Sequence, residues 1–230
     1  MVDTDPFQVK RLPKWHPRRV VKTLVAWIED KKARWDYEKH RLPECVFEDL
    51  PDCPDFHTED TAVTLKQMRH LLEICRRCTE KHQEGVFVEV GSYRGSTTMC
   101  LGKAVRPRTY VAVDPFMGWG GAEDDLRVFK QKTSGLENVV HERTTSGEAA
   151  RSWQYGPIAF VFVDAVHNYW NTNFDLSVWS ERVKKGGYIA AHDTDTKAFA
   201  GTRRAVYEKA NTEDFEVCVH VPDLVILRKL

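Results

Sequence analysis

The sequence has no net charge, because 34 Lys and Arg residues balance 34 Asp and Glu residues. Nucleic-acid-binding domains are usually clearly basic, so nothing here supports such a partner. No apolar run approaches the roughly 20 residues of a membrane span, and the N-terminus lacks the apolar stretch of a secretory signal. The six cysteines are too few for a disulfide scaffold in 230 residues. We therefore expect a cytoplasmic protein with free thiols and neither a membrane nor a nucleic-acid partner.

Short apolar segments alternate with segments of helical pattern from residue 85 onward. The apolar segments are rich in β-branched residues and nearly unbroken, as in strands buried on both faces of a sheet. They are 86–90, 109–114, 138–143, 158–164, 187–193, 215–221 and 224–230. Helices fit the gaps at 95–105, 123–133, 147–153, 171–184 and 200–211. Pro222 and Asp223 separate the last two strands and indicate a closing hairpin.

This alternation is typical of an α/β fold. We predict a three-layer, Rossmann-like sandwich with a seven-stranded, mostly parallel sheet and a C-terminal antiparallel hairpin. Gly91, Asp114, Asp164 and Asp193 all stand at the carboxyl ends of predicted strands. Because open α/β sheets bind ligands at that edge, we expect the functional site there.

The first 84 residues have a different pattern. An amphipathic helix is predicted over 18–40, where apolar residues recur at helical spacing. These residues are Val20, Val21, Leu24, Ile28, Trp35 and Tyr37. Three prolines in 42–58 predict a loop, and 61–81 reads as a second helix. The first helix has three open interpretations: it covers the edge of the site, it forms a homodimer contact, or it packs on its own domain.

The turn after the first predicted strand suits a ligand. Gly91 and Gly95 flank three residues there; glycine lets the backbone turn tightly, and the following helix offers unpaired N–H groups. Asp114, at the end of the second strand, can accept hydrogen bonds from both hydroxyls of a ribose. The spacing is not that of a dinucleotide-binding loop, which argues against a nicotinamide cofactor. The pattern favours a cofactor that contains a nucleoside.

Two runs carry a family resemblance. VEVGSYRGSTT at 88–98 resembles the first motif of class I S-adenosylmethionine-dependent methyltransferases, in the form found in catechol-type and macrocin-type O-methyltransferases. The run from Phe160 to Thr194 is similar to a wider methyltransferase group that includes cephalosporin-hydroxylase-like proteins. The resemblance covers about residues 60–230 and implies a methyltransferase domain at 61–230. Residues 1–60 would then be an N-terminal helical extension or cap.

The resemblance also implies roles for individual residues. Asp114 would hold the ribose of S-adenosylmethionine, Ser146 would lie near the adenine, and Asp164 would lie beneath the methyl-transfer site. The residues implied around the methionine part are Glu89, Gly91, Ser92, Tyr93, Gly95 and Ser96. Gly147 stands where catechol-type enzymes tend to have a polar adenine contact, so the sequence departs from the pattern at that point.

Asp164, His192 and Asp193 end neighbouring predicted strands and can converge on one ion, because parallel strands lie about 4.8 Å apart. In the resembling metal-dependent enzymes these places hold carboxylates or a carboxamide and bind Mg²⁺. Imidazole suits Mn²⁺ and other transition metals better than Mg²⁺. We therefore expect a divalent cation, either Mg²⁺ or Mn²⁺. The alternative is that His192 only lines or packs against the pocket.

His167 follows Asp164 by three residues. In macrocin-type sugar O-methyltransferases the histidine of this D-x-x-H element looks like the general base, which implies that His167 and Asp164 are catalytic. The chemistry fits, because an alkyl hydroxyl needs a base to attack and histidine titrates near neutral pH. The simpler alternative is a loop histidine that caps or packs.

Two further features have weaker interpretations. Cys75 and Cys78 form a C-x-x-C on a predicted helix, but no second such pair exists, so we expect thiols rather than a zinc site. The glycine-rich segment 116–125 is either a mobile flap over the cofactor or a surface loop.

The sequence thus predicts an S-adenosylmethionine-dependent methyltransferase with a divalent cation. Its acceptor would be a hydroxyl of a small molecule, namely a sugar, a glycosylated natural product or a polyphenol, as in natural product biosynthesis. A metal-independent methyltransferase is one alternative. A non-catalytic domain of the same fold, which binds a nucleoside or a partner, is the other.

Overall fold

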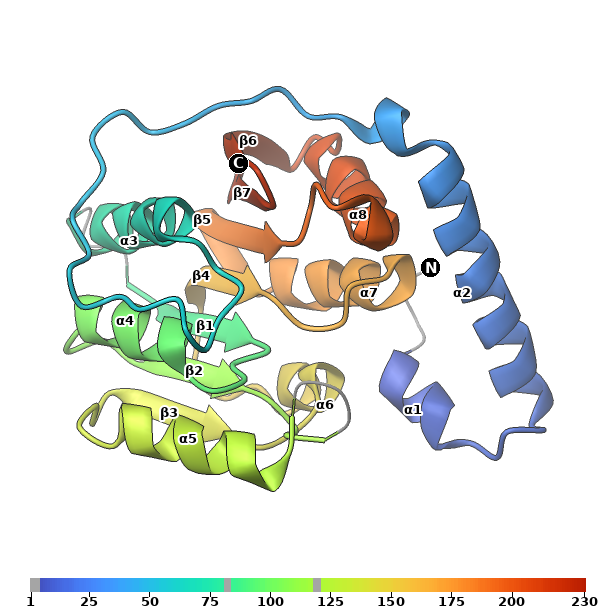
Figure 1. Cartoon of the computed structure of the whole chain (residues 1–230), viewed down its shortest axis with the longest axis horizontal. Coiled ribbons are helices and arrows are strands. Elements are labelled where there is room, and N and C mark those ends of the chain that lie inside the picture. Colours follow the sequence, from blue (N-terminus) through green and yellow to red (C-terminus); the bar gives the residue numbers. More distant parts are fainter. Residues whose placement is uncertain (1–4, 81–83, 118–120) are drawn as a thin grey trace.

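The computed structural model describes residues 5–80, 84–117 and 121–230. Its centre is a seven-stranded sheet in the order β3-β2-β1-β4-β5-β7-β6 (Figure 1). In this sheet β7 runs antiparallel to both of its neighbours, and the other described pairs are parallel. The strands are β1 Val86–Val90, β2 Tyr110–Val113, β3 Val139–Glu142, β4 Ile158–Val163, β5 Val183–His192, β6 Phe215–Val221 and β7 Leu224–Lys229.

Helices cover both faces of the sheet. On one face lie α3 Leu65–Glu80, α4 Ser96–Ala104 and α5 Glu123–Thr133. On the other lie α6 Ser146–Arg151, α7 Tyr169–Ser180 and α8 Ala200–Ala210, preceded by the short 3₁₀ helix η2 Lys197–Phe199. The result is a three-layer sandwich with two hydrophobic cores, one on each side of the sheet (Figure 1).

The central strands divide their side chains between these two cores. Phe87 and Phe160 pack with α3 and α4, whereas Val88 and Val161 pack with α7 and α8. Side chains of a strand alternate between faces, so a strand with helices on both sides is apolar at every position. That explains the unbroken apolar runs in the sequence.

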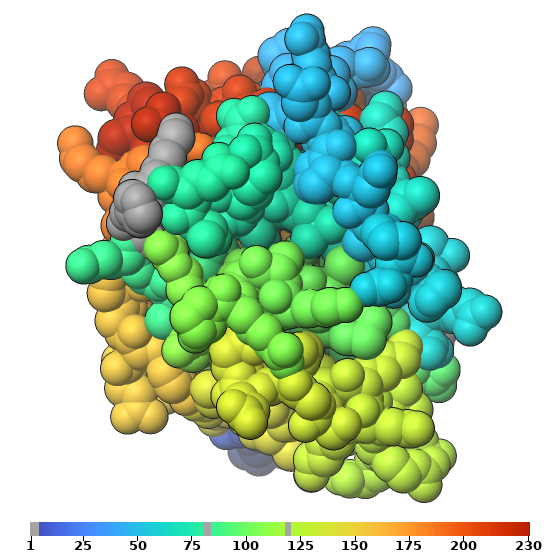
Figure 2. Space-filling model, turned by 90° about the vertical axis from the view of Figure 1, so that its left-hand side faces the viewer, coloured from blue at the N-terminus to red at the C-terminus, as the bar shows by residue number. Residues whose placement is uncertain are grey.

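The N-terminal residues form α1 Pro6–Arg11, α2 Pro17–Trp35 and the 3₁₀ helix η1 Tyr37–His40. Both α1 and α2 lie on the side toward which the parallel strands point (Figure 1). The chain then crosses to α3 as an extended segment. Figure 2 shows it as blue and cyan atoms beside α3 and α4. Arg69 fastens it by donating hydrogen bonds to the carbonyls of Leu50 and Pro51.

The predicted fold class is confirmed, including the C-terminal hairpin of β6 and β7. Two helix predictions were wrong in extent. The helix predicted over 18–40 ends at Trp35 and gives way to η1. The helix predicted over 171–184 ends at Ser180, because Val183 already pairs with Ile158 of β4. Helix α1 was not predicted. Within the described ranges, no helix combines the length and the apolar character needed to cross a bilayer.

Candidate active site

A cavity of about 550 Å³ opens at the carboxyl ends of β1, β2 and β4. The predicted site residues that line it are Glu89, Gly91, Ser92, Tyr93, Ser96, Asp114, Ser146, Asp164 and His167. Gly95, His192 and Asp193 do not line the cavity. Gly95 caps α4, and the other two stand behind the cavity at the end of β5. The structure therefore brings most of the predicted residues to one place.

The β1–α4 turn needs glycine where the sequence has it. Gly91 has φ +92°, and a Cβ atom there would lie 2.0 Å from the carbonyl oxygen of Asp164. This close approach joins the ends of β1 and β4, and no larger residue fits. Beside it, Ser92 Oγ is buried and has no hydrogen-bond partner among the described residues. The turn thus leaves a polar atom available at the cavity wall.

Asp114 is held at the end of β2 by backbone N–H groups. Tyr93 N donates to its Oδ2 at 3.0 Å, and Phe116 N donates to its Oδ1 at 2.7 Å. Burial raises the pKa of Asp114, and these backbone hydrogen bonds offset part of the rise. Each carboxylate oxygen has a second lone pair, so both can still accept a hydrogen bond from the cavity.

Glu89 lies beneath the same turn and is fully buried. It accepts hydrogen bonds from the hydroxyls of Thr98 and Tyr110, the second at 3.2 Å. Burial raises the pKa of Glu89 to about 8, and the nearby carboxylates of Asp164 and Asp114 add to the rise. A cation that enters the cavity would favour the ionised form of Glu89.

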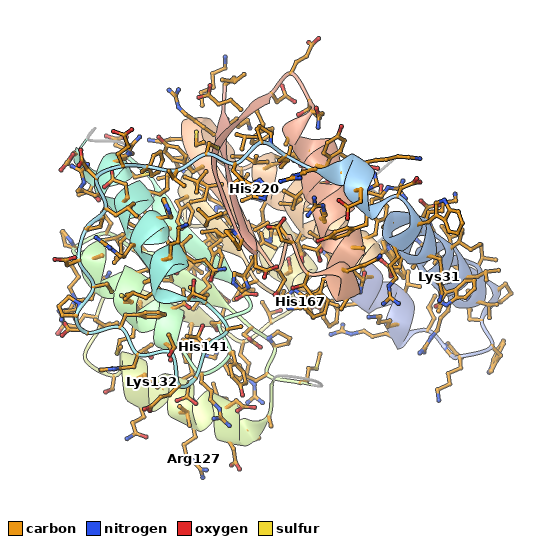
Figure 3. All side chains as sticks on the ribbon, turned by 45° about the horizontal axis from the view of Figure 1, so that its top comes forward. Lys31, Arg127, Lys132, His141, His167 and His220 are labelled. Carbon is orange, nitrogen blue, oxygen red and sulfur yellow. The ribbon has the colours of Figure 1, made fainter. Side chains whose placement is uncertain are left out.

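Two carboxylates and two histidines converge beside the cavity. His167 Nε2 lies 3.2 Å from Asp193 Oδ2 and 4.0 Å from Asp164 Oδ1. His192 Nδ1 lies 3.5 Å from the same two oxygens. Figure 3 labels His167, which lies at the ends of the parallel strands near the start of α8. One potential ligand atom each from Asp164, His167 and Asp193 lies within 4.8 Å of the others, so these three residues can surround one ion.

His192 differs from His167 in its surroundings. His192 is 2% exposed, and its Nε2 lies 3.2 Å from Gln67 Oε1. Burial opposes charging of the ring, but Asp164 and Asp193 outweigh that effect and raise the pKa of His192 to about 10. Its distance of 3.5 Å from each carboxylate is long for a hydrogen bond, so charge attraction dominates these contacts.

Phe7 and Asp175 are among the cavity-wall residues that the sequence reasoning missed. Phe7 reaches the cavity from α1, and Asp175 reaches it from α7. Asp175 accepts a hydrogen bond of 2.5 Å from Ser146 Oγ, and burial raises the pKa of Asp175 to about 7. Asp175 stands between Phe174 and Leu176 in an otherwise buried stretch, and that signal could have identified it. Nothing in the sequence pattern connects Phe7 with a site more than 80 residues away.

Asp5 explains why Phe7 is there. Its Oδ1 accepts from Phe7 N at 2.9 Å and caps α1. Its Oδ2 lies 3.0 Å from Arg151 Nη1 and close to Gly147, where a Cβ would be 2.2 Å away. Gly147 is therefore the place where the N-terminal segment approaches α6.

The loop after β2 contributes Met117 and Gly121 to the cavity wall. Residues 118–120 lie outside the described residues, so the flap over 116–125 stays a prediction. Cys75 and Cys78 lie in the core between α3 and the sheet.

Comparisons with known proteins agree with this site. Residues 88–194, which hold the turn, Asp114 and the two-histidine cluster, match a family described as a methyltransferase domain. The solved O-methyltransferase NovP is 20% identical with TM-score 0.57, over 74% of this chain and 83% of NovP. TomG, an O-methyltransferase from Streptomyces achromogenes solved in complex with SAM, is 15% identical with TM-score 0.56, over 87% of this chain and 89% of TomG. SMU.1697c from Streptococcus mutans, solved in complex with SAH, is 17% identical with TM-score 0.52, over 64% of this chain and 89% of SMU.1697c.

The family match over residues 88–194 agrees with the predicted methyltransferase, and the structural likenesses show a shared fold. Likeness at such low identity shows the fold and leaves the acceptor open. Residues 88–194 match the family described as a methyltransferase domain, and the chain has the Rossmann-like fold that these solved methyltransferases share.

Proposed function

We propose that this protein transfers a methyl group from S-adenosylmethionine to a hydroxyl of a small molecule, with His167 as the general base. The observation that carries the proposal is the position of His167. It lines the cavity beside Asp164, and its Nε2 is 3.2 Å from a carboxylate. A base held by a carboxylate next to the cofactor cavity is the arrangement that an alcohol nucleophile requires.

The residues around the cavity suit S-adenosylmethionine. Asp114 has free lone pairs for the ribose hydroxyls, and Ser92 offers an unpartnered hydroxyl. Asp164 supplies negative charge for the positively charged methionine end, and that positive charge would favour the ionised form of Glu89 beside it. Ser146 and Asp175 form a polar pair at the α6–α7 side, where an exocyclic amine of adenine would find an acceptor. When bound, S-adenosylmethionine supplies an electrophilic methyl group on a sulfonium sulfur.

His167 then has two tasks. With Nε2 facing the Asp193 carboxylate at 3.2 Å, the other ring nitrogen, Nδ1, is left to accept the proton of the acceptor hydroxyl. The carboxylate of Asp193 keeps the ring in position and stabilises the imidazolium that forms. The cavity wall holds the acceptor oxygen near the methyl group, and this proximity supplies much of the rate.

We further propose a divalent cation, Mg²⁺ or Mn²⁺, beside this base. His192 Nδ1 lies 3.5 Å from an oxygen of Asp164 and of Asp193, so these three residues would hold the ion and leave His167 free to act as the base. The same two carboxylates also form a group with His167, but an imidazole bound to the metal could not take the acceptor's proton. His192 Nδ1 is buried without a hydrogen-bond partner of good geometry among the described residues, as expected for a ligand atom. A bound cation would lower the pKa of the acceptor hydroxyl.

One observation favours a second candidate, a metal-independent methyltransferase. With a pKa of about 10, His192 is protonated at neutral pH and itself supplies a positive charge between Asp164 and Asp193. The imidazolium would then stand where the cation would otherwise be needed. Chelation distinguishes the two candidates, because only the metal-assisted enzyme loses activity with EDTA.

The acceptor class follows from the lining of the cavity. Phe7, Met117 and Val166 contribute apolar surface to it. An acceptor with a hydrophobic body next to its hydroxyl fits best, which favours a polyphenol or a glycosylated aromatic compound over a bare sugar.

The test is release of S-adenosylhomocysteine during incubation with a panel of catechols, flavonoids, glycosides and sugars, with and without EDTA. We expect turnover on at least one hydroxyl acceptor. His167→Gln should lower kcat by about 10²- to 10⁴-fold while S-adenosylhomocysteine still binds. The matched control is His57→Gln, a histidine exposed on the loop before α3. Full activity in the His167 variant would overturn the assignment of the base.

A further inference from the structure

Helix α2 has its two faces reversed relative to a normal surface helix. Its inner face packs against α7 and α8 through polar or small residues, including Asp30 and Ala33. Asp30 accepts a hydrogen bond from Tyr169 N at 2.8 Å, and Glu29 forms an ion pair with Arg204 at 2.6 Å. A surface helix ordinarily buries its apolar side and exposes its charges.

The apolar side of α2 instead faces solvent. We call this surface the outer stripe and define it as Val20, Val21, Leu24, Trp27, Ile28 and Trp35. Their exposed fractions range from 37% for Ile28 to 90% for Trp35. From its first to its last residue the stripe is about 22 Å long at 1.5 Å per residue. A continuous exposed apolar surface of this kind marks an interaction site.

The charges of α2 identify the occupant. All residues of α2 are described, and they include six basic and two acidic side chains. Asp30 is engaged on the inner face, whereas Glu29 pairs both with Arg204 on the inner face and with Lys32 at 3.0 Å. Lys31 and Lys32 are exposed within or beside the outer stripe, and Figure 3 labels Lys31 on α2 at the edge of the molecule. The outer stripe itself is therefore apolar with Lys31 within it, and the Lys32–Glu29 pair lies at its edge.

We propose that the outer stripe binds the surface of an anionic phospholipid bilayer, with α2 lying in the plane of the interface. Helices that bind in this way combine Trp and Leu on one face with Lys and Arg beside it. Lysines attract anionic headgroups, and tryptophan rings suit the boundary between headgroups and acyl chains. A second copy of this chain fits less well, because pairing two stripes would bring basic residues against basic residues.

This inference revises the expectation of no membrane partner. The net charge is zero over the whole chain, but the charges on α2 are segregated between its two faces. The homodimer expected from the sequence stays an alternative occupant of the same surface. Since α2 lies on the side toward which the parallel strands point (Figure 1), a docked bilayer would face the side of the molecule that carries the cavity.

The experiment is flotation of the full-length protein with vesicles of phosphatidylcholine alone or of equal parts phosphatidylcholine and phosphatidylserine. We expect binding to the anionic vesicles only, weakened by salt. The double variant Leu24→Glu, Ile28→Glu should lose binding. The double variant Lys31→Glu, Lys32→Glu should bind at least about 25-fold more weakly, since each basic residue contributes roughly fivefold.

Val46→Glu is the matched control, because Val46 is 51% exposed and lies outside α2. It should bind like the unaltered protein. Thermal unfolding and S-adenosylhomocysteine binding verify that each variant is folded. Failure of the folded, unaltered protein to float with anionic vesicles overturns the proposal, as does equal binding to both vesicle types. Sedimentation that shows a dimer, converted to monomer by Leu24→Glu, Ile28→Glu, would also overturn it and assign the stripe to a second copy.

Discussion

Replacement of Gly91 by alanine should damage both the fold and the cofactor site. At φ +92° an alanine is strained, and its Cβ would lie 2.0 Å from Asp164 O and 2.7 Å from Asp164 C. Both atoms belong to the backbone at the end of β4, so no side chain can move aside. The substitution must therefore displace either the β1–α4 turn or the strand end that carries Asp164.

Gly156 offers a matched comparison. It has φ +86°, and a Cβ there would meet nothing within 4 Å. An alanine in this left-handed conformation costs about 1–2 kcal/mol, and the lower entropy of the unfolded chain returns about 0.4–1 kcal/mol. Gly156→Ala should therefore destabilise the protein by about 1 kcal/mol. Gly91→Ala carries the same terms plus about 1–3 kcal/mol for the overlap, which gives about 2–4 kcal/mol in total.

The assay is urea unfolding followed by tryptophan fluorescence, together with calorimetric titration of S-adenosylhomocysteine. The difference between the two variants isolates the overlap, because strain and chain entropy are common to both. Gly91→Ala should also bind S-adenosylhomocysteine at least about tenfold more weakly, a difference of about 1.4 kcal/mol. Equal destabilisation by the two substitutions, with unaltered affinity in both, would refute this account of the turn.

Two other predictions concern titrating histidines. Binding of Mn²⁺ at pH 8 should release a proton, because His192, with a pKa of about 10, is protonated there and must give up its charge beside a cation. Calorimetry in buffers of different ionisation enthalpy measures the number of protons released, and His192→Asn should abolish the release. A proton count of zero in the unaltered protein would contradict the cluster geometry. His70 is fully buried, and burial and then nearby Lys66 and Arg69 lower its pKa below 6.5. The unfolded chain therefore binds the proton more tightly, so stability conferred by His70 is complete above pH 6.5 and declines as the pH falls toward the lowered pKa. The free energy of unfolding of the His70→Leu variant, measured with urea, should decline less between pH 7.5 and 5.5 than that of the unaltered protein. Parallel pH profiles of the two proteins would contradict this role.

The strands and the edge that carries the site could be predicted from the sequence. Residues 158–163 are apolar at every position, and residues 86–90 are apolar except at Glu89, because helices cover both faces of the sheet. Such runs leave little choice of structure. The positions of Asp114 and Asp164 in the site could be predicted because both residues directly follow predicted strands. The same logic located His192 and Asp193 beside them.

Other features depend on contacts that no local pattern encodes. Residues 181–184 are predicted as helix, but 181–182 form a turn, and pairing of Val183 with Ile158 begins β5 at Val183. Phe7 reaches the cavity because Asp5 forms an ion pair with Arg151 and packs closely against Gly147, which has no side chain to block it. The amphipathic pattern of 18–40 predicted a helix correctly over α2, but it gave no indication that the apolar side would face outward.

The central claim is that the cavity at the ends of β1, β2 and β4 binds the methyl donor. The most direct test is calorimetric titration of S-adenosylhomocysteine into EDTA-treated protein, with Asp114→Asn measured beside it. We predict one-to-one binding with a dissociation constant on the order of micromolar, weakened about tenfold by Asp114→Asn, because a charged hydrogen bond to the ribose is lost. Absence of heat from folded, unaltered protein, or equal affinity in the two proteins, would contradict the claim.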